Sequence, residues 1–513
     1  MLTSIIRGKV AFALKLVALS LLAAILGLLA QSAFAQHEYV ISGFLALSVV
    51  LLVGTYFTKI SIPLKFFIPG LLLLFAFVLS PILYTVTMSG FNYKTGNILS
   101  KNEAMVQIGS RSVVSDEAGT SFDVKIGTVD GKPALLASDI ANKAYFLSTE
   151  KNILTLLATQ VTLDENGVAK SAPGFTLLTE AEMGNADRIY SAAHFAYKDP
   201  YFLSLQGFDV AAVMRTNLTF DAQSGEYVSL IDGSRYKDNG RGNFANTANS
   251  KDVLEPGWRA PIWFENYKNL FSDTRVRAPL VKVFLWTVVF ALSTVLSTFA
   301  LGLLLALVLN KPLFGRRIYR SILILPYAMP SVMSILIWGG MFNTEFGAIN
   351  NLLGTDIAWL NNPTSARIAV ILVNLWLGFP YFYLVSSGAL QAIPSELLEA
   401  AAIDGANPRQ IFRKITLPLL LQILSPLLIA SFAFNFNNFN LIYLLTGGGP
   451  SDTLSGQIAG ATDILISYTY KIAFGSNVQD LGLASAISLV IFVLVASISM
   501  YGLKKSKVLE SFK

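Results

Sequence analysis

Eight runs of mainly apolar residues, each long enough to cross a lipid bilayer, recur along the 513-residue chain. They occupy residues 16–35, 40–57, 67–88, 281–309, 322–341, 368–390, 419–445 and 481–503. About 20 apolar residues in an α-helix span the hydrocarbon core, and a helix pairs its own backbone groups where no water can. The runs therefore predict an all-α polytopic membrane protein with eight transmembrane helices. With 53% hydrophobic and only 14% charged residues, an ordinary soluble or disordered chain is excluded.

Residues 90–278, between the third and fourth runs, differ from the rest of the chain. They hold 22 of the 32 acidic and 19 of the 38 basic residues. Turn signals separate short apolar runs in this segment: Asp130-Gly131, Glu165-Asn166-Gly167 and Asp232-Gly233. We predict a large mixed, β-rich domain inserted between helices 3 and 4, with helices 1–3 in residues 1–89 and helices 4–8 in residues 279–513. The sequence leaves open whether this domain is a solvated cap or a docking platform for an extracytoplasmic partner.

Basic residues gather in alternate loops, which predicts the orientation of the chain. They precede the first run, follow the last, and lie in the loops after the second, fourth and sixth runs. Both termini are therefore expected in the cytoplasm of a bacterium, with residues 90–278 in the periplasm and the spans in the inner membrane. Arg275, Arg277 and Lys282 are an exception, because they flank the fourth run on the outside. A cleavable signal peptide ending near Ala35 is an alternative for the first run and leaves the later topology unchanged.

Several kinds of chemistry are excluded by what the chain lacks. It has no cysteine and two histidines, which argues against a metal centre and against thiol catalysis. No Asp, Glu, Lys or Arg lies in the central part of any run, and such residues usually mark ion or proton paths. A phosphate-binding Gly-x4-Gly-Lys-Ser/Thr loop is also missing. We therefore expect no catalytic residue and no cofactor, and any pumping must be driven by another protein. No nucleic-acid partner is expected either, because the excess of basic residues belongs to the membrane part and its loops.

The cytoplasmic loop at residues 391–418 has the signals of two short helices. Ser395 is a plausible N-cap for the first helix, and Gly405 suits a left-handed C-terminal cap. Asn407-Pro408 restarts a helix, which Leu417-Pro418 is expected to end at the membrane. Two helices joined at a fixed glycine corner predict a rigid projection that can transmit force.

The spacing within this loop resembles the EAA loop of ABC importer permeases. Glu399-Ala400-Ala401 is followed by Gly405, Ile415 and Leu417-Pro418 at the intervals of that motif. The resemblance implies that the loop docks in a cleft of a separate cytoplasmic ATPase subunit. It assigns the coupling role to Glu399, Ala400, Ala401, Asp404, Gly405, Ile415, Leu417 and Pro418.

The order of the segments resembles the maltose/maltodextrin permease family of type I ABC importers. Eight spans, a large insert after the third, and the stretches at 324–328 and 431–439 carry this resemblance. It implies a type I importer core, a second permease subunit (MalG-like), and a dimer of ATPase subunits (MalK-like) that bind ATP and Mg. A periplasmic maltose-binding protein would dock with help from the insert. A permease for another neutral sugar such as trehalose, a passive channel, a secondary transporter and a membrane-anchored receptor remain alternatives.

Two polar helix faces are candidates for an oligosaccharide site. Ser431, Phe434, Asn435 and Asn438 lie at spacings of 0, +3, +4 and +7, which puts them on one face of a helix. Amides both donate and accept hydrogen bonds, as sugar hydroxyls require, although polar residues in spans also join helices together. Asn437 and Asn440 are expected to point elsewhere.

In the sixth run, Asn374, Leu377, Gly378 and Tyr381 repeat this spacing around Pro380. A packing kink is the alternative explanation for this group. The family resemblance assigns sugar contacts to Leu377, Gly378, Tyr381, Ser431, Phe434, Asn435 and Asn438, and Asn374 is added on its spacing alone.

Overall fold

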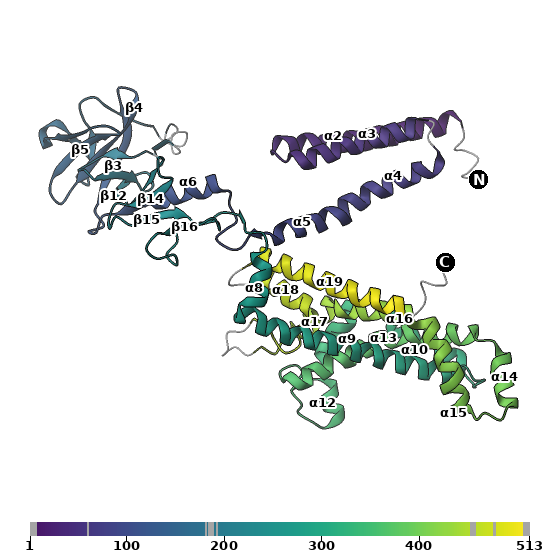
Figure 1. Ribbon diagram of the computed structural model, residues 1–513. Helices are drawn as coiled ribbons and strands as arrows, with labels where there is room; N and C mark the ends of the chain where they lie inside the picture. Colours follow the sequence, from purple (N-terminus) through teal and green to yellow (C-terminus); the bar gives the residue numbers. More distant parts are fainter. Residues whose placement is uncertain are drawn as a thin grey trace. The chain divides into compact units, whose positions relative to one another are not determined.

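The computed structural model describes residues 8–58, 61–179, 182, 189–190, 193–451, 458–475 and 479–505. Among these residues are seven helices long and apolar enough to cross a membrane, together with one sharply bent helix pair. The chain forms two compact units, residues 1–89 with 485–513, and residues 90–484. Figure 1 shows the helices and the β-rich part of the chain.

The first unit contains the first three spans and most of the last. α2 (Lys9–Ala35) and α3 (Tyr39–Phe57) pack as a helical hairpin. α4 (Ile62–Leu74), η1 (Phe75–Leu79) and α5 (Ser80–Ser89) form one continuous span that contains a single π-helical turn. α19 (Leu481–Lys505) forms the last span. These four helices confirm the spans expected there.

The second unit is built around α9 (Thr274–Leu309) and α13 (Pro363–Ala392), the fourth and sixth spans. The two helices pack closely because Gly302 of α9 has no side chain. A Cβ there would lie 2.7 Å from the backbone of Phe382 and Tyr383. Small residues allow such an approach between helices within a membrane.

The fifth span is not the single helix that we expected over 322–341. α10 (Arg316–Ala328) ends at Met329, and α11 (Ser331–Met341) starts after Pro330, at an angle of 94° to α10. The residue before a proline is pushed toward extended backbone, and Met329 has φ −84° and ψ 142°. Pro330 thus breaks the span in two.

The seventh span also departs from the prediction of one helix over 419–445. A helix runs without interruption through α15 (Pro408–Ile411), η3 (Phe412–Thr416) and α16 (Leu417–Phe436). Leu417-Pro418 does not end this helix as expected. The π-helical turn at η3 lies where Pro418 leaves the helix without a donor. The helix ends instead before Asn437 and Asn438, and α17 (Phe439–Thr446) follows.

Short helices flank the spans of this unit. α8 (Glu265–Ser272) precedes α9, and α12 (Ala348–Leu353) lies between α11 and α13. α14 (Ser395–Ile403) follows α13, and α18 (Leu465–Phe474) follows α17. These helices connect the spans.

The insert is β-rich, as predicted. Its nine-stranded sheet has the order β10-β11-β12-β3-β4-β5-β6, with β2 (Val113–Ser115) and β9 (Phe175–Leu177) paired to β12 and β3. The bounds of the ordered strands are β3 (Ser121–Val129), β4 (Lys132–Asp139), β5 (Ala144–Thr149), β6 (Ile153–Leu156), β10 (Phe195–Ala196), β11 (Tyr201–Leu205) and β12 (Val210–Thr216). Asp130 and Gly131, both with positive φ, join β3 to β4 at the expected turn. Buried Phe122, Leu135 and Leu203 belong to the core of this sheet.

A second, antiparallel sheet contains four strands in sequence order. These are β13 (Leu218–Asp221), β14 (Glu226–Ser229), β15 (Arg235–Asp238) and β16 (Phe244–Asn246). α6 (Lys101–Arg111) packs beside it through Ala104 and Ile108 and begins with a capping box between Ser100 and Glu103. η2 (Ala158–Gln160) precedes the pair β7 (Thr162–Leu163) and β8 (Ala169–Ser171).

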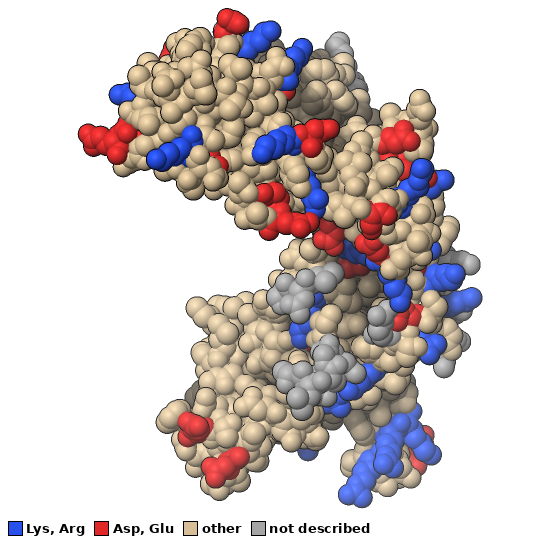
Figure 2. Space-filling model, turned by 90° about the vertical axis from the view of Figure 1, so that its left-hand side faces the viewer, with Lys and Arg blue, Asp and Glu red and all other residues tan. Residues whose placement is uncertain are grey.

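β1 (Phe91–Asn92) pairs with β17 (Ala260–Pro261), so the chain enters and leaves the insert side by side. Acidic and basic side chains are interspersed over the surface of the insert (Figure 2). The strands of the insert thus lie between Phe91 and Pro261.

Candidate functional site

A cavity of about 610 Å³ lies among the spans of the second unit. It is lined by α9, α13, α16 and α17, and by both breaks, at Met329–Pro330 and at Asn437–Asn438. Interrupted helices at membrane depth are tolerated where the irregular backbone lines a cavity. None of the described residues that line it is an Asp, Glu, Lys or Arg. Its chemistry suits a neutral ligand.

All the residues that the sequence predicted for an oligosaccharide site line this one cavity. They are Leu377, Gly378, Tyr381, Ser431, Phe434, Asn435 and Asn438, together with Asn374. Asn440 also lines the cavity, so the expectation that it points elsewhere is wrong. The expectation of one continuous helical face is wrong as well, because Asn438 lies beyond the end of α16. Its Oδ1 instead accepts a hydrogen bond from the N–H of Leu441 at the start of α17.

Residues around the break in the fifth span were missed from the sequence. Tyr327, Met329 and Ser331 line the cavity, on either side of Pro330. Pro330 was a signal for this break, because a proline inside an apolar run biases the residue before it away from the helical conformation. The sequence alone did not show that this boundary faces the polar segment of the seventh span.

Asn374 and Asn435 form a buried hydrogen bond between α13 and α16. The Nδ2 of Asn374 donates to the Oδ1 of Asn435 at 2.6 Å, and the Nδ2 of Asn435 donates to the backbone oxygen of Ser431 at 2.8 Å. Both side chains are buried. The amide of Asn435 is thus occupied by protein groups, and its geometry is that of an interhelical contact at the cavity wall.

Gly378 lies on α13 where this helix is in close contact with α9. A Cβ at this position would lie 2.9 Å from Cγ2 of Thr298. The absence of a side chain at Gly378 therefore allows α9 and α13 to pack closely beside the cavity. This agrees with the alternative explanation of the group as a packing feature.

The aromatic and remaining polar groups of the lining are more open. The Phe434 ring is 70% exposed, and Tyr381 and Asn438 are half-buried. An exposed ring can pack against the apolar face of a ligand, while an amide nearby supplies hydrogen bonds. This combination of groups is suited to a polar, uncharged ligand with a hydroxyl-rich edge.

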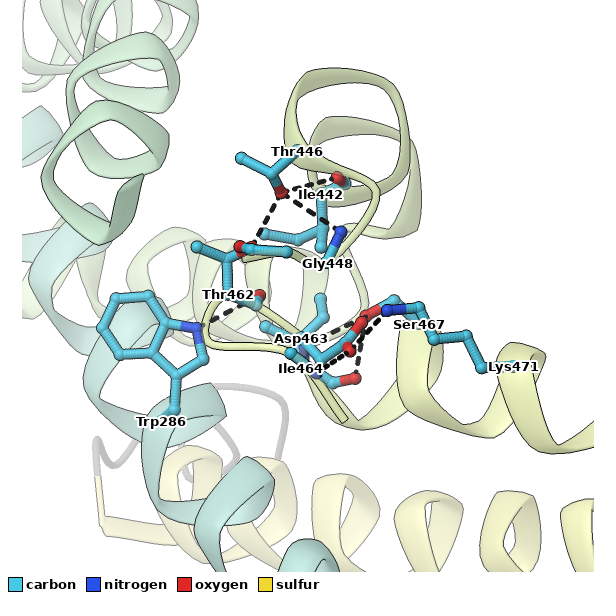
Figure 3. Close-up of polar contacts among 11 residues, drawn as sticks. Trp286, Ile442, Thr446, Gly448, Thr462, Asp463, Ile464, Ser467 and Lys471 are labelled. Atoms are coloured by element: carbon cyan, nitrogen blue, oxygen red, sulfur yellow. Dashed lines mark hydrogen bonds and ion pairs between the residues drawn. The ribbon is translucent and has the colours of Figure 1, made fainter. Parts of the chain in front are cut away.

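The loop that follows α17 is tied to neighbouring elements by a network of polar contacts (Figure 3). The hydroxyls of Thr446 and Thr462 lie 2.7 Å apart, and Nε1 of Trp286 on α9 donates to the Thr462 backbone oxygen at 3.2 Å. Gly447 and Gly448 both have positive φ, so the chain makes a tight turn here. A Cβ on Gly448 would overlap the Asp463 carboxylate. The end of α17 is therefore tied to α9 through Thr462.

Asp463 is fully buried within this network. Its Oδ2 accepts hydrogen bonds from Nζ of Lys471 and from the N–H of Gly460, each at 2.7 Å, and its Oδ1 accepts one from Oγ of Ser467 at 2.8 Å. Burial raises the pKa of the Asp463 carboxyl, and the ammonium group of Lys471 opposes that rise. A buried charge is stable only with such partners. The pair holds the loop after α17 against α18.

The loop at 391–418 has the glycine corner that the sequence predicts. Gly405 has φ +83°, and the N–H groups of Gly405 and Ala406 donate to the backbone oxygens of Ala402 and Ala401. These two bonds define a Schellman cap. Asn407 caps the next helix in a capping box with Gln410. Ser395 is not an N-cap, because it is the first residue of α14 and Pro394 precedes it.

One face of this loop packs on the spans and another faces solvent. Phe412, Leu398 and Leu417 pack against a buried cluster of residues from α9, the end of α13 and α16, which comprises Leu303, Ala389, Ile393, Leu420 and Leu424. Ile415 is half-buried, whereas Glu399, Ala400, Asp404 and Gly405 are exposed. A movement imposed on the exposed face would thus reach the spans through packed side chains.

Comparison with known proteins covers almost the whole chain. Residues 298–506 match the family described as "Binding-protein-dependent transport system inner membrane component", and residues 72–150 match "N-terminal of TM subunit in PBP-dependent ABC transporters". Among curated relatives, the "Maltose/maltodextrin transport system permease protein MalF" of Photorhabdus laumondii is 38% identical over 97% of both chains. The proteins of that name from Escherichia coli K12 and Vibrio parahaemolyticus are each 36% identical, over 96% and 87% of this chain and 97% and 86% of theirs.

Proposed function

This chain belongs to the family of the maltose/maltodextrin permease MalF, and from that we infer that it is the permease subunit of an ABC importer that carries maltose and maltodextrins across the bacterial inner membrane. The observation that carries this inference is 36–38% identity over most of the chain. The chain is a transport subunit and not an enzyme. ATP and Mg bind to partner ATPase subunits, which hydrolyse the nucleotide.

We propose that the cavity between α9, α13 and α16 holds the oligosaccharide during transport. The uncharged lining, the exposed Phe434 ring and the amide of Asn438 support this assignment. Tyr381 supplies a second aromatic ring. Asn435 would act by fixing the wall through Asn374, since its amide already bonds to protein groups.

The partners follow from the importer architecture. We propose a MalG-like second permease and a MalK-like ATPase dimer, with a periplasmic binding protein that docks on the insert. The loop at 391–418 would meet the ATPase through its exposed residues, which include Glu399, Asp404 and Gly405. This assignment puts both termini in the cytoplasm.

Transport would proceed by alternating access. Closure of the ATPase dimer moves the loop at 391–418, and the cluster around Phe412 passes the movement to α9, α13 and α16. The sugar then enters the outward-open cavity, and ATP hydrolysis returns the spans to the inward-open state. Such coupling requires that ATP and sugar each favour one state over the other.

Uptake by the assembled complex in proteoliposomes tests the site. Phe434→Ala and Asn438→Ala should each reduce maltose uptake by about fivefold or more, since losing a ring or amide contact costs about 1 kcal/mol or more. Phe432→Ala is the matched control, because this ring belongs to the same helix and does not line the cavity. All three variants should copurify with the partner subunits.

Unchanged uptake in Phe434→Ala and Asn438→Ala would refute the assignment of the cavity. A panel of maltose, maltotriose and trehalose then tests the substrate. Uptake of trehalose in preference to maltose would replace the proposed substrate while leaving the site in place.

A further inference from the structure

Large aromatic side chains are exposed where the insert returns to the fourth span. Trp263 is 72% exposed, Phe264 80% and Phe271 61%. They lie on α8 and immediately before it. Exposed apolar side chains gathered in this way mark a site of contact with a membrane or another protein.

The other face of α8 is firmly attached to the protein. Leu270 is fully buried, and Nδ2 of the buried Asn266 donates to the backbone oxygen of Phe91 at 3.1 Å. Phe264, Lys268 and Phe271 lie at spacings of 0, +4 and +7 on the opposite face, and all three are exposed. α8 is therefore an amphipathic helix whose outward face is aromatic and basic.

The backbone before α8 is fixed in an unusual conformation. Trp263 has φ +53°, which is rare for a bulky residue. The N–H groups of Ile262 and Trp263 both donate to the backbone oxygen of Gly90 at 2.8 Å. A strained backbone conformation persists where the surrounding structure enforces it. Here the two hydrogen bonds to Gly90 hold the backbone at Trp263, whose indole ring is exposed.

α8 lies at the boundary of the membrane-spanning part. It ends at Ser272, and the apolar window of α9 begins at Val276. Asp273 has an extended ψ of 112°, and α8 does not continue along the axis of α9 but runs across it (Figure 1). Aromatic side chains are enriched at this depth, where the ring meets the headgroup region.

The charges near α8 favour an anionic surface. Lys268 is exposed, and Arg277 and Lys282 follow within the first turns of α9. Arg277 and Lys282 are among the basic residues that depart from the distribution expected on the outer side. Phosphate groups of anionic lipids would complement them.

We propose that Trp263 and α8 form an interfacial anchor in the outer leaflet of the inner membrane. Phe264 and Phe271 lie at the headgroup boundary, and Lys268 and Arg277 contact the phosphates of anionic phospholipids. The anchor fixes the depth at which the insert joins the fourth span. This inference depends on the fourth span crossing the membrane but not on the identity of the sugar.

The absence of cysteine from the chain allows a direct test with spin labels. Single cysteines replace Phe264, Phe271 or, as a control, Phe208, which is 53% exposed between β11 and β12. The full complex, with partner subunits free of cysteine, is reconstituted in vesicles of phosphatidylethanolamine and phosphatidylglycerol. Accessibility of each label to oxygen and to a water-soluble nickel chelate then reports its depth.

Labels at 264 and 271 should be more accessible to oxygen than to nickel, and the label at 208 should show the reverse. Labels at 264 and 271 that match the one at 208 would overturn the anchor. Shielding from both reagents would overturn it too, because a protein partner would then cover the face. Replacing phosphatidylglycerol by phosphatidylcholine should make the labels at 264 and 271 shallower, and an unchanged depth would overturn the contact with anionic headgroups.

Discussion

The corner at Gly405 offers the sharpest test of the proposed coupling between this permease and an ATPase subunit. Gly405 has φ +83°, and a Cβ there would meet no atom within 4 Å. Gly405→Ala therefore adds no clash, and its whole cost is the left-handed backbone, about 1–2 kcal/mol. If the free loop of the variant relaxes out of the left-handed conformation at residue 405, docking must restore that conformation and pay the same free energy. The affinity for the ATPase should therefore fall by at most the corresponding factor of about 5–30.

Titration of purified permease with ATPase subunits measures this affinity, and substrate-stimulated ATP hydrolysis measures the coupling. Gly405→Asn should have a smaller effect, because asparagine visits left-handed backbone more readily. Gly388→Ala is the matched control, since it adds the same methyl group in equally open surroundings within the helix α13. If Gly405→Ala and Gly388→Ala both bind and stimulate the ATPase like the unchanged chain, the corner has no role in docking.

Three further predictions follow from buried contacts within the second unit. Asn374→Leu removes the donor to a buried amide oxygen and should cost about 0.6–2 kcal/mol, seen as a lower thermal midpoint of the purified complex. An unchanged midpoint would contradict it. Asp463→Asn breaks a buried ion pair, at a cost of up to about 3–5 kcal/mol, and should speed hydrogen exchange in α18, whereas Lys471→Arg should not. Gly378→Ala should impair uptake through its clash with Thr298, at about 1–3 kcal/mol, and the added change Thr298→Ser should restore uptake by removing the methyl group.

Local signals in the sequence were sufficient to locate the apolar spans, the insert and the corner of the coupling loop, although not the breaks within the fifth and seventh spans. The length of an apolar run is a property of one segment of the chain, so the spans could be located without knowing which helices pack against them. Gly405 and Asn407 likewise act through their own backbone, within a few residues. The candidate site was predicted as a set of residues because the family motif named them.

The tertiary structure decided which groups face one another. Asn374 and Asn435 are 61 residues apart, and only packing of α13 on α16 makes them partners. Gly378 is explained by Thr298 on another helix. Pro330 is a local signal for a break that the predicted spans did not include. That this break and the one at Asn437–Asn438 line a single cavity depends on helix packing. Apolar length is thus a local property that the sequence shows by itself, whereas the pairing of distant side chains is set by the packing of whole helices.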